Sequence, residues 1–508
     1  MIGFKHGLIG LLIVSVGLSM FGCGKGKTDD ENTLTIEMLD AGYGTQFLKD
    51  MKDEFLKEHP GKKIEITGTP FFPKLKANLR AGEKVTTTDI FFAQDNFFDV
   101  ISEGRHGTYD NILTDLTDVY DSTVEGENMS IREKVSPEYL QYATVNEKIY
   151  SMPWAQGFQG LVYNKTLFDD NGINIPRTTD ELTAVADRVK DMGKYPFIHP
   201  AKNDYWNGVY QVWWAQYEGA EEFQDFFYGK NSVTTEGYAR PEAFLAQGRT
   251  EALELLSKYI NPDNGYVSAS CNVWEFQQVQ TYFINGEAFM APNGDWLENE
   301  SSFGNAQIRF MKIPVVSNIV NVLPKKTITT DKQLSDVIAA IDSGAESFDG
   351  VAQEDFDRVK EARRISFTTA YTFNAVIPAY SNAVPLAKEF LKFIASDKGL
   401  QMYKQSFKGA EMPYTFSDKS KQVCTNQSPF QTSVNEILKD AKRVYYGYNS
   451  PLIYKAGMAS FTVQSANVSF ALGTSSAADR MTAEEVIDFE YENALSKWND
   501  WLMLAGLS

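Results

Sequence analysis

Cysteine and histidine are scarce in this sequence. The 508 residues include only three cysteines and four histidines. So few cysteines exclude a disulfide framework. His6 lies in the apolar segment at the start of the chain, and His59, His106 and His199 lack the spacing of metal ligands. Nucleophile-elbow and metalloprotease motifs are also absent, so the common hydrolase signatures are missing.

A surplus of basic residues is missing as well. With 48 Lys and Arg against 67 Asp and Glu, the formal net charge is -19, which repels a phosphate backbone. We therefore exclude nucleic acid as a partner and interpret the acidity as a solvated surface. Hydrophobic residues make up 43% and aromatic residues 13% of the chain. We expect the chain to fold, and its length favours two lobes with separate cores.

The apolar segment at the start of the chain is too short to cross a bilayer comfortably. It extends over residues 7–20 after a lysine, and Cys23 follows Gly22. This arrangement predicts a secretory signal over 1–22. The Gly22-Cys23 pair resembles a bacterial lipobox, which implies that Cys23 carries a diacylglyceryl group and becomes the mature N-terminus.

The polar, glycine-containing residues 23–32 predict a flexible tether between membrane and domain. We expect an extracytoplasmic protein anchored to the cell membrane, because two acyl chains hold a protein stably where one does not. An ordinary cleaved signal and a retained anchor are the alternatives. The sequence leaves open whether Cys271 and Cys424 form a disulfide.

Hydrophobic periodicity predicts an α/β fold in the first part of the mature chain. Apolar residues alternate with polar ones over 33–39, which predicts a strand, and they recur at helical spacing over 48–55. Two further strands are predicted at 64–66 and 89–93. Strand, helix and strand form the unit of a parallel sheet, whose ligands bind at the carboxyl ends of the strands.

The sequence predicts two helices and one insertion further along the chain. Thr178 and Glu181 form a capping box before the first of these helices. Pro385 suits the first turn of the second helix, and we expect Gly399 to close it. The segment 325–364 is polar and weakly periodic, so we interpret it as an insertion.

Four separated segments carry a resemblance to a known family. They are residues 39–44 (LDAGYG), 89–96 (DIFFAQDN), 149–178 (from IYSMPW to PRT) and 283–296 (FINGEAFM to NGDW). In this order they resemble the family 1 extracellular solute-binding proteins, the maltodextrin-binding type. The resemblance covers nearly the whole mature chain apart from the insertion.

This resemblance implies a two-lobed, periplasmic-binding-protein-like fold of type II, the Venus-flytrap fold, with crossover hinge strands. By the same resemblance, lobe one comprises 33–152 and 314–411, with the insertion at 325–364, and lobe two comprises 153–313 and 412–508. The implied partner is an ABC transporter, whose membrane permease and cytoplasmic ATPase are supplied by other chains. We expect no enzymatic activity, cofactor or metal.

A carbohydrate site needs aromatic planes for the C–H faces of the sugar, with carboxylates and amides at its hydroxyl edges. The aromatic candidates are Tyr43, Trp154, Tyr205, Trp206, Trp296 and Tyr448. The polar candidates are Asp95, Asn96, Gln156 and Asp295. The resemblance adds most to Trp296 and Asp95, since the matching tryptophan stacks on sugar in carbohydrate-binding members.

Each candidate also has a structural interpretation, because most aromatic side chains of a folded chain lie in its core. Trp213 and Trp214 fall in an apolar run of helical character, and we expect both in the core. Trp274 is compatible with either interpretation.

Three other functions fit the same sequence features. An aromatic box with an acid such as Asp95 or Asp295 also suits a polyamine. A secreted glycoside hydrolase would need aromatic residues and paired carboxylates too. A sensor or adhesion lipoprotein could use the same fold without transport. We favour a clamp that closes by hinge motion on a carbohydrate and releases it unaltered. The expected cargo is an oligosaccharide.

Overall fold

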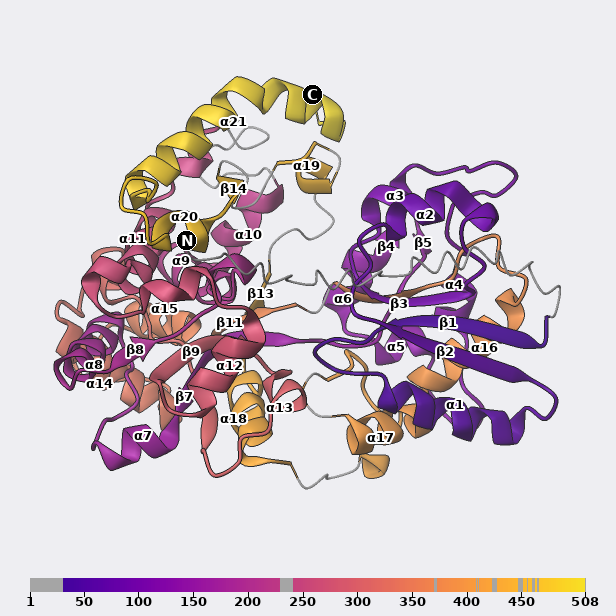
Figure 1. Ribbon diagram of the computed structural model, residues 1–508, viewed down its shortest axis with the longest axis horizontal. Coiled ribbons are helices and arrows are strands. Elements are labelled where there is room, and N and C mark those ends of the chain that lie inside the picture. Colours follow the sequence, from indigo (N-terminus) through magenta and orange to yellow (C-terminus); the bar gives the residue numbers. More distant parts are fainter. Residues whose placement is uncertain are drawn as a thin grey trace, which may run out of the picture.

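The structure, a computed structural model, describes most of the chain beyond its N-terminal segment. The described residues are 31–228, 241–369, 372–407, 409, 411–422, 427–445, 451–454, 456–458, 462–463 and 466–507. They form two α/β lobes that lie side by side, each around its own sheet (Figure 1). The predicted lipidation site Cys23, the thiol of Cys424 and the candidate Tyr448 lie outside the described residues.

Lobe one is built on a five-stranded sheet with the strand order β2-β1-β3-β12-β6. β1 (Thr33–Leu39), β2 (Lys63–Thr69) and β3 (Ile90–Gln94) are parallel, as their spacing predicts. β12 (Phe373–Val376) and β6 (Met152–Pro153) complete the sheet in antiparallel pairings. The loops after β1 and β3 therefore leave the sheet at the same edge.

Helices cover this sheet and bury the apolar face that the sequence indicates. α1 (Gln46–Glu58) buries Phe47, Leu48, Met51 and Phe55. The other helices of the lobe are α2 (Leu75–Ala81), α3 (Phe98–Ser102), α4 (Thr117–Asp121), α5 (Ile131–Lys134), α6 (Pro137–Ala143), α16 (Val384–Ala395) and α17 (Asp397–Ser406). A small hairpin joins β4 (Thr144–Val145) to β5 (Lys148–Ile149).

The helix predicted from Pro385 is α16, but Gly399 does not close it. α16 ends at Ala395, and Ser396 follows as its C-cap. The Ser396 hydroxyl then accepts a hydrogen bond from the backbone N–H of Gly399, which makes Ser396 the N-cap of α17. The predicted single boundary is therefore a junction between two helices.

Lobe two is built on a six-stranded sheet. The path of its strands is β13-β11-β7-β9-β8, and β10 pairs with β7 outside this path. The strands are β7 (Phe158–Asn164), β8 (Tyr195–Phe197), β9 (Ala288–Gly294), β10 (Ile308–Met311), β11 (Ile365–Thr368) and β13 (Lys442–Val444). β7 and β9 are buried along most of their lengths, which is typical of strands covered on both faces.

The most deeply buried helix of lobe two is α9 (Asn207–Glu218), which includes Trp213 and Trp214 in the core as expected. The N-cap of α8 is Thr178, as predicted, but the side chain of Glu181 accepts from the N–H of Arg177 instead of completing a capping box. The other elements of the lobe are α7 (Lys165–Asp170), α8 (Thr179–Asp191), α10 (Ala220–Tyr228), α11 (Gln247–Ile260), α12 (Phe276–Ile284), α13 (Leu297–Glu300), α14 (Asp331–Asp342), α15 (Gln353–Arg364), α18 (Pro429–Leu438), α19 (Pro451–Tyr454), β14 (Thr462–Val463), β15 (Ala466–Asn467), α20 (Val468–Gly473) and α21 (Ala483–Ala505).

The segment interpreted as an insertion in lobe one lies in lobe two. α14 and α15 bury a cluster of their own together with Val315. They lead directly into β11, which pairs with β7 and β13. The expected return to lobe one near Pro314 is therefore too early, because the chain returns between β11 and β12.

The third crossing also differs from the expected position near Met412. Met412, Tyr414 and Phe416 all pack in the core of lobe one. The hydroxyl and backbone N–H of Ser417 then donate to Asp397 at the start of α17, at 2.7 and 2.8 Å. The chain leaves lobe one only after Ser417.

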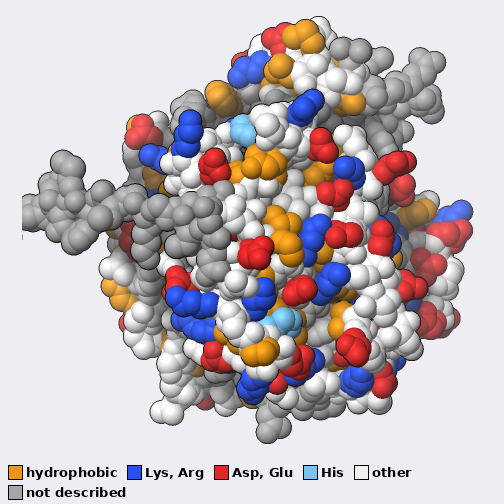
Figure 2. Space-filling view, turned by 90° about the vertical axis from the view of Figure 1, so that its right-hand side faces the viewer, with side chains coloured by type: hydrophobic (Ala, Val, Ile, Leu, Met, Phe, Trp, Pro, Cys, Tyr) orange, Lys and Arg blue, Asp and Glu red, His pale blue; other side chains and the backbone are white. Residues whose placement is uncertain are grey.

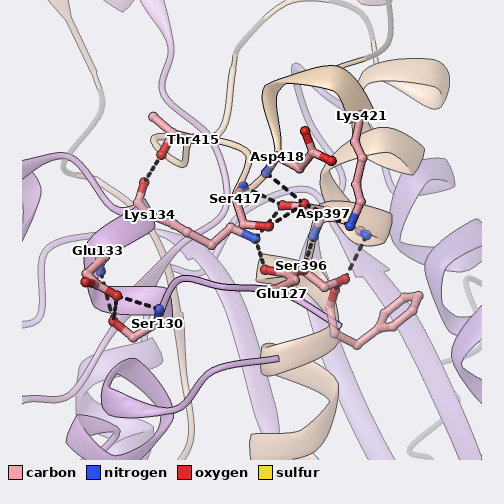
Figure 3. A network of polar contacts seen from close by, with 12 residues as sticks. Glu127, Ser130, Glu133, Lys134, Ser396, Asp397, Thr415, Ser417, Asp418 and Lys421 are labelled. Atoms are coloured by element: carbon pink, nitrogen blue, oxygen red, sulfur yellow. Dashed lines mark hydrogen bonds and ion pairs between the residues drawn. The ribbon is translucent and has the colours of Figure 1, made fainter. Parts of the chain in front are cut away.

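A buried network of charges fixes the position of Asp397, which binds Ser417 (Figure 3). The Lys134 ammonium is fully buried and lies 2.6 Å from Glu127 and 2.9 Å from Asp397. Burial raises the pKa of Asp397, but the hydrogen bonds from Ser417 and the charge of Lys134 outweigh it, so that the pKa falls to about 2. The stabilisation from Asp397 is therefore present above its unfolded pKa and is lost only as the pH falls toward 2.

The outer end of lobe one carries surface charges of both signs. Figure 2 shows acidic and basic side chains interspersed over this face, with apolar side chains in small groups between them. This distribution agrees with the interpretation of the acidity as a solvated surface. Across the described part of the chain, none of the helices combines the length and the apolar composition that a membrane crossing requires.

Replacing Lys134 with alanine should destabilise the protein by about 3–5 kcal/mol, because the change leaves two buried carboxylates without their cation. Denaturant unfolding measures the effect. The matched control is Lys388→Ala, which removes a partly exposed pair with Asp118 and should cost about 0–1 kcal/mol. Equal losses for the two variants would contradict the structural role of the network.

Candidate functional site

A hydrogen bond joins the two lobes at the centre of the molecule. Tyr43 belongs to the loop that follows β1 in lobe one, and Asp295 directly follows β9 in lobe two. The Tyr43 hydroxyl donates to Oδ1 of Asp295 at 2.7 Å. Both side chains are buried, with exposed fractions of 6% and 1%. Two candidates chosen from separate motifs therefore meet across the interface.

Aromatic rings surround Tyr43. Its ring centroid lies 6.0 Å from that of Trp296 and 6.2 Å from that of Trp154, both in edge-to-face geometry. Phe373 and Phe407 lie closer, at 5.3 and 4.9 Å. Edge-to-face pairs at these distances are attractive, so the rings fix the position of the Tyr43 hydroxyl.

Two glycines let the backbone approach this cluster closely. A Cβ on Gly157 would overlap the hydroxyl of Thr369 and would lie 2.5 Å from that of Tyr43. Gly409 has a φ of +113°, and a Cβ there would lie 2.9 Å from the carbonyl oxygen of Asp295. Gly157 lies on the first crossing between the lobes, and Gly409 of lobe one approaches Asp295 of lobe two, so side chains at either position would push the lobes apart.

Burial makes the Asp295 carboxyl hard to ionise. Desolvation raises its pKa to about 7, although the hydrogen bond from Tyr43 lowers it in part. Oδ2 of Asp295 has no hydrogen-bond partner among the described residues. A buried carboxyl oxygen without a partner costs free energy, so this atom is suited to a hydrogen bond with a bound molecule.

Tyr205 lies next to this group from the side of lobe two. Its ring centroid is 6.4 Å from that of Trp296, nearly perpendicular to it. Tyr205 is half-buried, and burial raises the pKa of its hydroxyl above the ordinary value. The structure therefore brings Tyr43, Tyr205, Asp295 and Trp296 together.

Trp154 and Trp206 are placed in the cores of the lobes. Trp154 is 1% exposed, and its Nε1–H donates to the carbonyl oxygen of Ala93 at 3.1 Å. Trp206 is fully buried in lobe two, where its ring stacks on Tyr259 at 6.5 Å. These positions favour the core interpretation for both residues. Trp206 also lacks any ring contact with Tyr43 or Trp296 among the described residues, so it does not belong to their group.

The remaining polar candidates have partners outside the group around Tyr43 and Asp295. Asp95 follows β3 and lies 3.0 Å from the ammonium of Lys76. Desolvation raises the pKa of Asp95 despite this cation. Oδ1 of Asn96 accepts from the N–H of Phe98, which makes Asn96 a cap of the following turn. The backbone N–H of Gln156 donates to the carbonyl of Glu411 at 2.6 Å, which pairs the first crossing with the segment that follows α17.

A cavity opens between α17 of lobe one and α18 of lobe two. It has a volume of about 670 Å³, which falls within the range of small-molecule sites. Tyr403, Phe407, Gly409 and Glu411 line it from lobe one, and α18 lines it from lobe two. Since Phe407 and Gly409 also contact Tyr43, the cavity adjoins the aromatic group.

The cavity adds residues that the sequence motifs do not reveal. Tyr403 is buried, and its hydroxyl has no hydrogen-bond partner among the described residues. Gln431, Asn435 and Lys439 line the cavity at intervals of four, which puts them on one face of α18. This spacing is the signal that could have identified the polar face of α18 from the sequence.

Comparisons with known proteins assign this chain to a family. The family model described as bacterial extracellular solute-binding protein matches residues 41–401. The chain is similar to the multiple sugar-binding protein of Streptococcus mutans, with 25% identity over 300 residues, 58% of this chain and 64% of that protein. It is also similar to the diacetylchitobiose binding protein NgcE of Streptomyces coelicolor, with 25% identity over 53% of this chain and 54% of that protein.

A third relative is the polygalacturonan/rhamnogalacturonan-binding protein YtcQ of Bacillus subtilis, with 23% identity over 68% of this chain and 70% of that protein. The alignments with the first two relatives thus span less than two thirds of those proteins.

Solved structures show the same fold. The raffinose complex of the solute-binding protein RafE superposes with a TM-score of 0.59 at 16% identity, covering 91% of this chain and 99% of that one. A chitin oligosaccharide binding protein superposes with a TM-score of 0.58 at 18% identity, covering 92% and 99%. The two-lobed α/β architecture and the family model agree, and the chain belongs to the bacterial extracellular solute-binding protein family.

Proposed function

We propose that this chain is the solute-binding lipoprotein of a bacterial ABC importer, and that it captures a carbohydrate between its lobes and passes it unaltered to the permease. The observation that carries the proposal is the group of Tyr43, Asp295 and Trp296 at the lobe interface, beside a cavity of about 670 Å³. Aromatic rings beside a carboxyl oxygen without a partner are the features that a sugar ring with hydroxyl edges requires.

The relatives support a carbohydrate as the class of solute. The names of the three relatives specify multiple sugars, diacetylchitobiose and polygalacturonan or rhamnogalacturonan. All of these are carbohydrates, although they differ in size and linkage. The cavity volume suits more than a single sugar ring, so we propose an oligosaccharide.

The proposed mechanism is closure of the lobes around the solute. The Tyr43–Asp295 hydrogen bond and the ring contacts of Trp296 form only when the lobes meet. A solute that contacts both lobes shifts the open and closed populations toward the closed form. Release to the permease requires only that the lobes separate, so no bond of the solute is broken.

Asp295 has two ways to bind a sugar hydroxyl. Because its pKa is raised to about 7, the carboxyl exists in both protonation states near neutral pH. The protonated form donates through one oxygen, and the ionised form accepts. A polyamine, the alternative cargo, gains less from a carboxyl that is half neutral, and the cavity beside it is also lined by Lys439 and Arg443.

Membrane attachment through Cys23 completes the proposal. The short apolar segment and the Gly22-Cys23 pair support lipidation at this cysteine, and the tether 23–32 would separate the lobes from the bilayer. The permease and ATPase subunits would come from other chains.

Trp296→Ala should lower the affinity for the preferred oligosaccharide by about tenfold or more, because the change removes one aromatic plane of the site. Calorimetric titration against a panel of mono- and oligosaccharides, with polyamines included, identifies the solute and measures the loss. Trp274→Ala is the matched control, since Trp274 lies elsewhere in lobe two next to Tyr282. An unchanged affinity in Trp296→Ala would remove this residue from the site, and sugar turnover would refute the binding role.

The pH dependence of stability should reveal the buried carboxyl. Since the folded pKa of Asp295 is about 7, well above its unfolded value, the folded state holds an extra proton between about pH 4 and 7. Stability should therefore fall as the pH rises through this window and then level off. Asp295→Asn removes the titrating group, so the difference in Tm between wild type and variant should change from pH 4.5 to 7.5. A constant difference would show that Asp295 does not titrate in this range.

Cys23→Ala should move the protein from the membrane fraction to the soluble extracellular fraction, because the variant lacks the residue that accepts the lipid. Cell fractionation with immunodetection measures the distribution. Cys271→Ala is the control, as Cys271 is a buried free thiol in lobe two that should not affect the distribution. A wild-type N-terminal peptide that begins before Cys23 and carries no acyl chain would argue against lipidation.

A further inference from the structure

α18 presents two different faces, and the polar one lines the cavity between the lobes. Phe430, Val434 and Ile437 are buried against the core of lobe two. Gln431 and Asn435 lie on the other face and line the cavity. The sequence of this helix therefore provides a packed side for lobe two and a row of hydrogen-bonding groups for the cavity.

Cationic side chains extend this polar row. Lys439 follows Asn435 by one helical turn, and Arg443 lies on the adjoining strand β13; both line the cavity. Among the described residues, neither has a carboxylate within ion-pair distance, whereas Lys404 on the opposite wall lies 3.9 Å from Glu411. Glu436 is the other acidic residue of the lining.

Among the described residues, the lining thus contains three cationic and two acidic side chains. A local positive balance is unusual in a chain with a formal net charge of -19. The overall negative charge repels an anion only weakly at the cavity, because salt screens charges beyond a Debye length of about 8 Å. Cations that line the cavity act at shorter range and therefore decide which charge the cavity accepts.

We infer that the cavity between α17 and α18 selects an anionic carbohydrate, one whose sugar carries a carboxylate or a sulfate, through Lys439 and Arg443. This inference rests on the proposed function, since it assigns the chemistry of the solute at the same interface. A guanidinium matches a carboxylate or sulfate through two parallel N–H donors, and a lysine adds a point charge.

Neutral side chains of the lining can form hydrogen bonds with the uncharged parts of the sugar. Gln431 and Asn435 supply amide donors and acceptors for ring hydroxyls. Tyr403 also lines the cavity, and its buried hydroxyl has no hydrogen-bond partner among the described residues. A hydroxyl buried without a partner is costly, so a solute that supplies one is favoured. The cavity therefore combines charge recognition at Lys439 and Arg443 with hydroxyl recognition near Tyr403.

The test compares an acidic oligosaccharide with its uncharged form. Tri-galacturonate and its methyl ester differ in charge while they keep the same rings and linkages, and a sulfated trisaccharide distinguishes sulfate from carboxylate. Titration calorimetry should show the acid, the sulfate or both binding at least about tenfold more tightly than the ester at about 20 mM NaCl, and the gap should narrow at about 300 mM NaCl. An ester that binds as tightly as both anionic sugars would overturn the inference.

Matched charge variants test the cavity itself. Arg443→Gln and Lys439→Gln should each lower the affinity for the anionic sugar several-fold and leave that for the ester nearly unchanged. Lys442→Gln is the control, because Lys442 is exposed, precedes Arg443 in β13 and does not belong to the lining. An equal effect of Lys442→Gln would overturn the local role of Arg443. Binding of neutral oligosaccharides without preference for charge would leave the proposed function intact, whereas failure of the folded protein to bind any sugar would contradict that function.

Discussion

The contact between Tyr43 and Asp295 is the interaction on which the meeting of the two lobes depends. It places a carboxyl from lobe two in an interface where water is excluded, and only one oxygen of this carboxyl receives a hydrogen bond from a described residue. Burial without full pairing costs free energy, which is expressed in the raised pKa of Asp295. An interface of this kind gains stability from a molecule that supplies the missing partner. Under the proposed function, solute binding and closure of the lobes are coupled at this carboxyl group.

The crossings between the lobes give this coupling its mechanical basis. Gly157 on the first crossing and Gly409 in lobe one let the backbone approach Tyr43 and Asp295, where larger side chains would not fit. The last crossing begins from a fixed point, because Ser417 is tied to Asp397. Under the proposed function, the lobes would close by hinge motion about these crossings, as is common in hinged binding proteins.

The sequence predicts the parts of this structure that depend on local patterns. The alternation over 33–39 and the helical spacing over 48–55 identify β1 and α1 because one face of each is buried against the sheet. The segment 325–364 is misplaced because its weak apolar pattern reflects a small cluster that α14 and α15 build largely for themselves. The pairing of β11 with β7, more than 200 residues away in the sequence, and with β13 assigns the segment to lobe two.

Prediction of the candidate site from the sequence has the same limit. Tyr43 and Asp295 are separated by 252 positions, so the sequence can nominate each residue but cannot show that they meet. Trp206 has the same residue type as Trp296 and is also a candidate from the sequence, although the resemblance favours Trp296. Its burial follows from Tyr259 and other distant side chains that only the fold brings to it. Tyr403 lies outside the family motifs and becomes visible only through the cavity it lines.

The central claim is that one solute is held by both lobes at this interface. A crystal structure of the protein with its preferred oligosaccharide tests it most directly. The account predicts a sugar ring against Trp296, a sugar hydroxyl within hydrogen-bond distance of Oδ2 of Asp295, and an extension of the solute into the cavity between α17 and α18. A solute bound to one lobe alone, or bound away from Asp295 with the lobes apart, would contradict it.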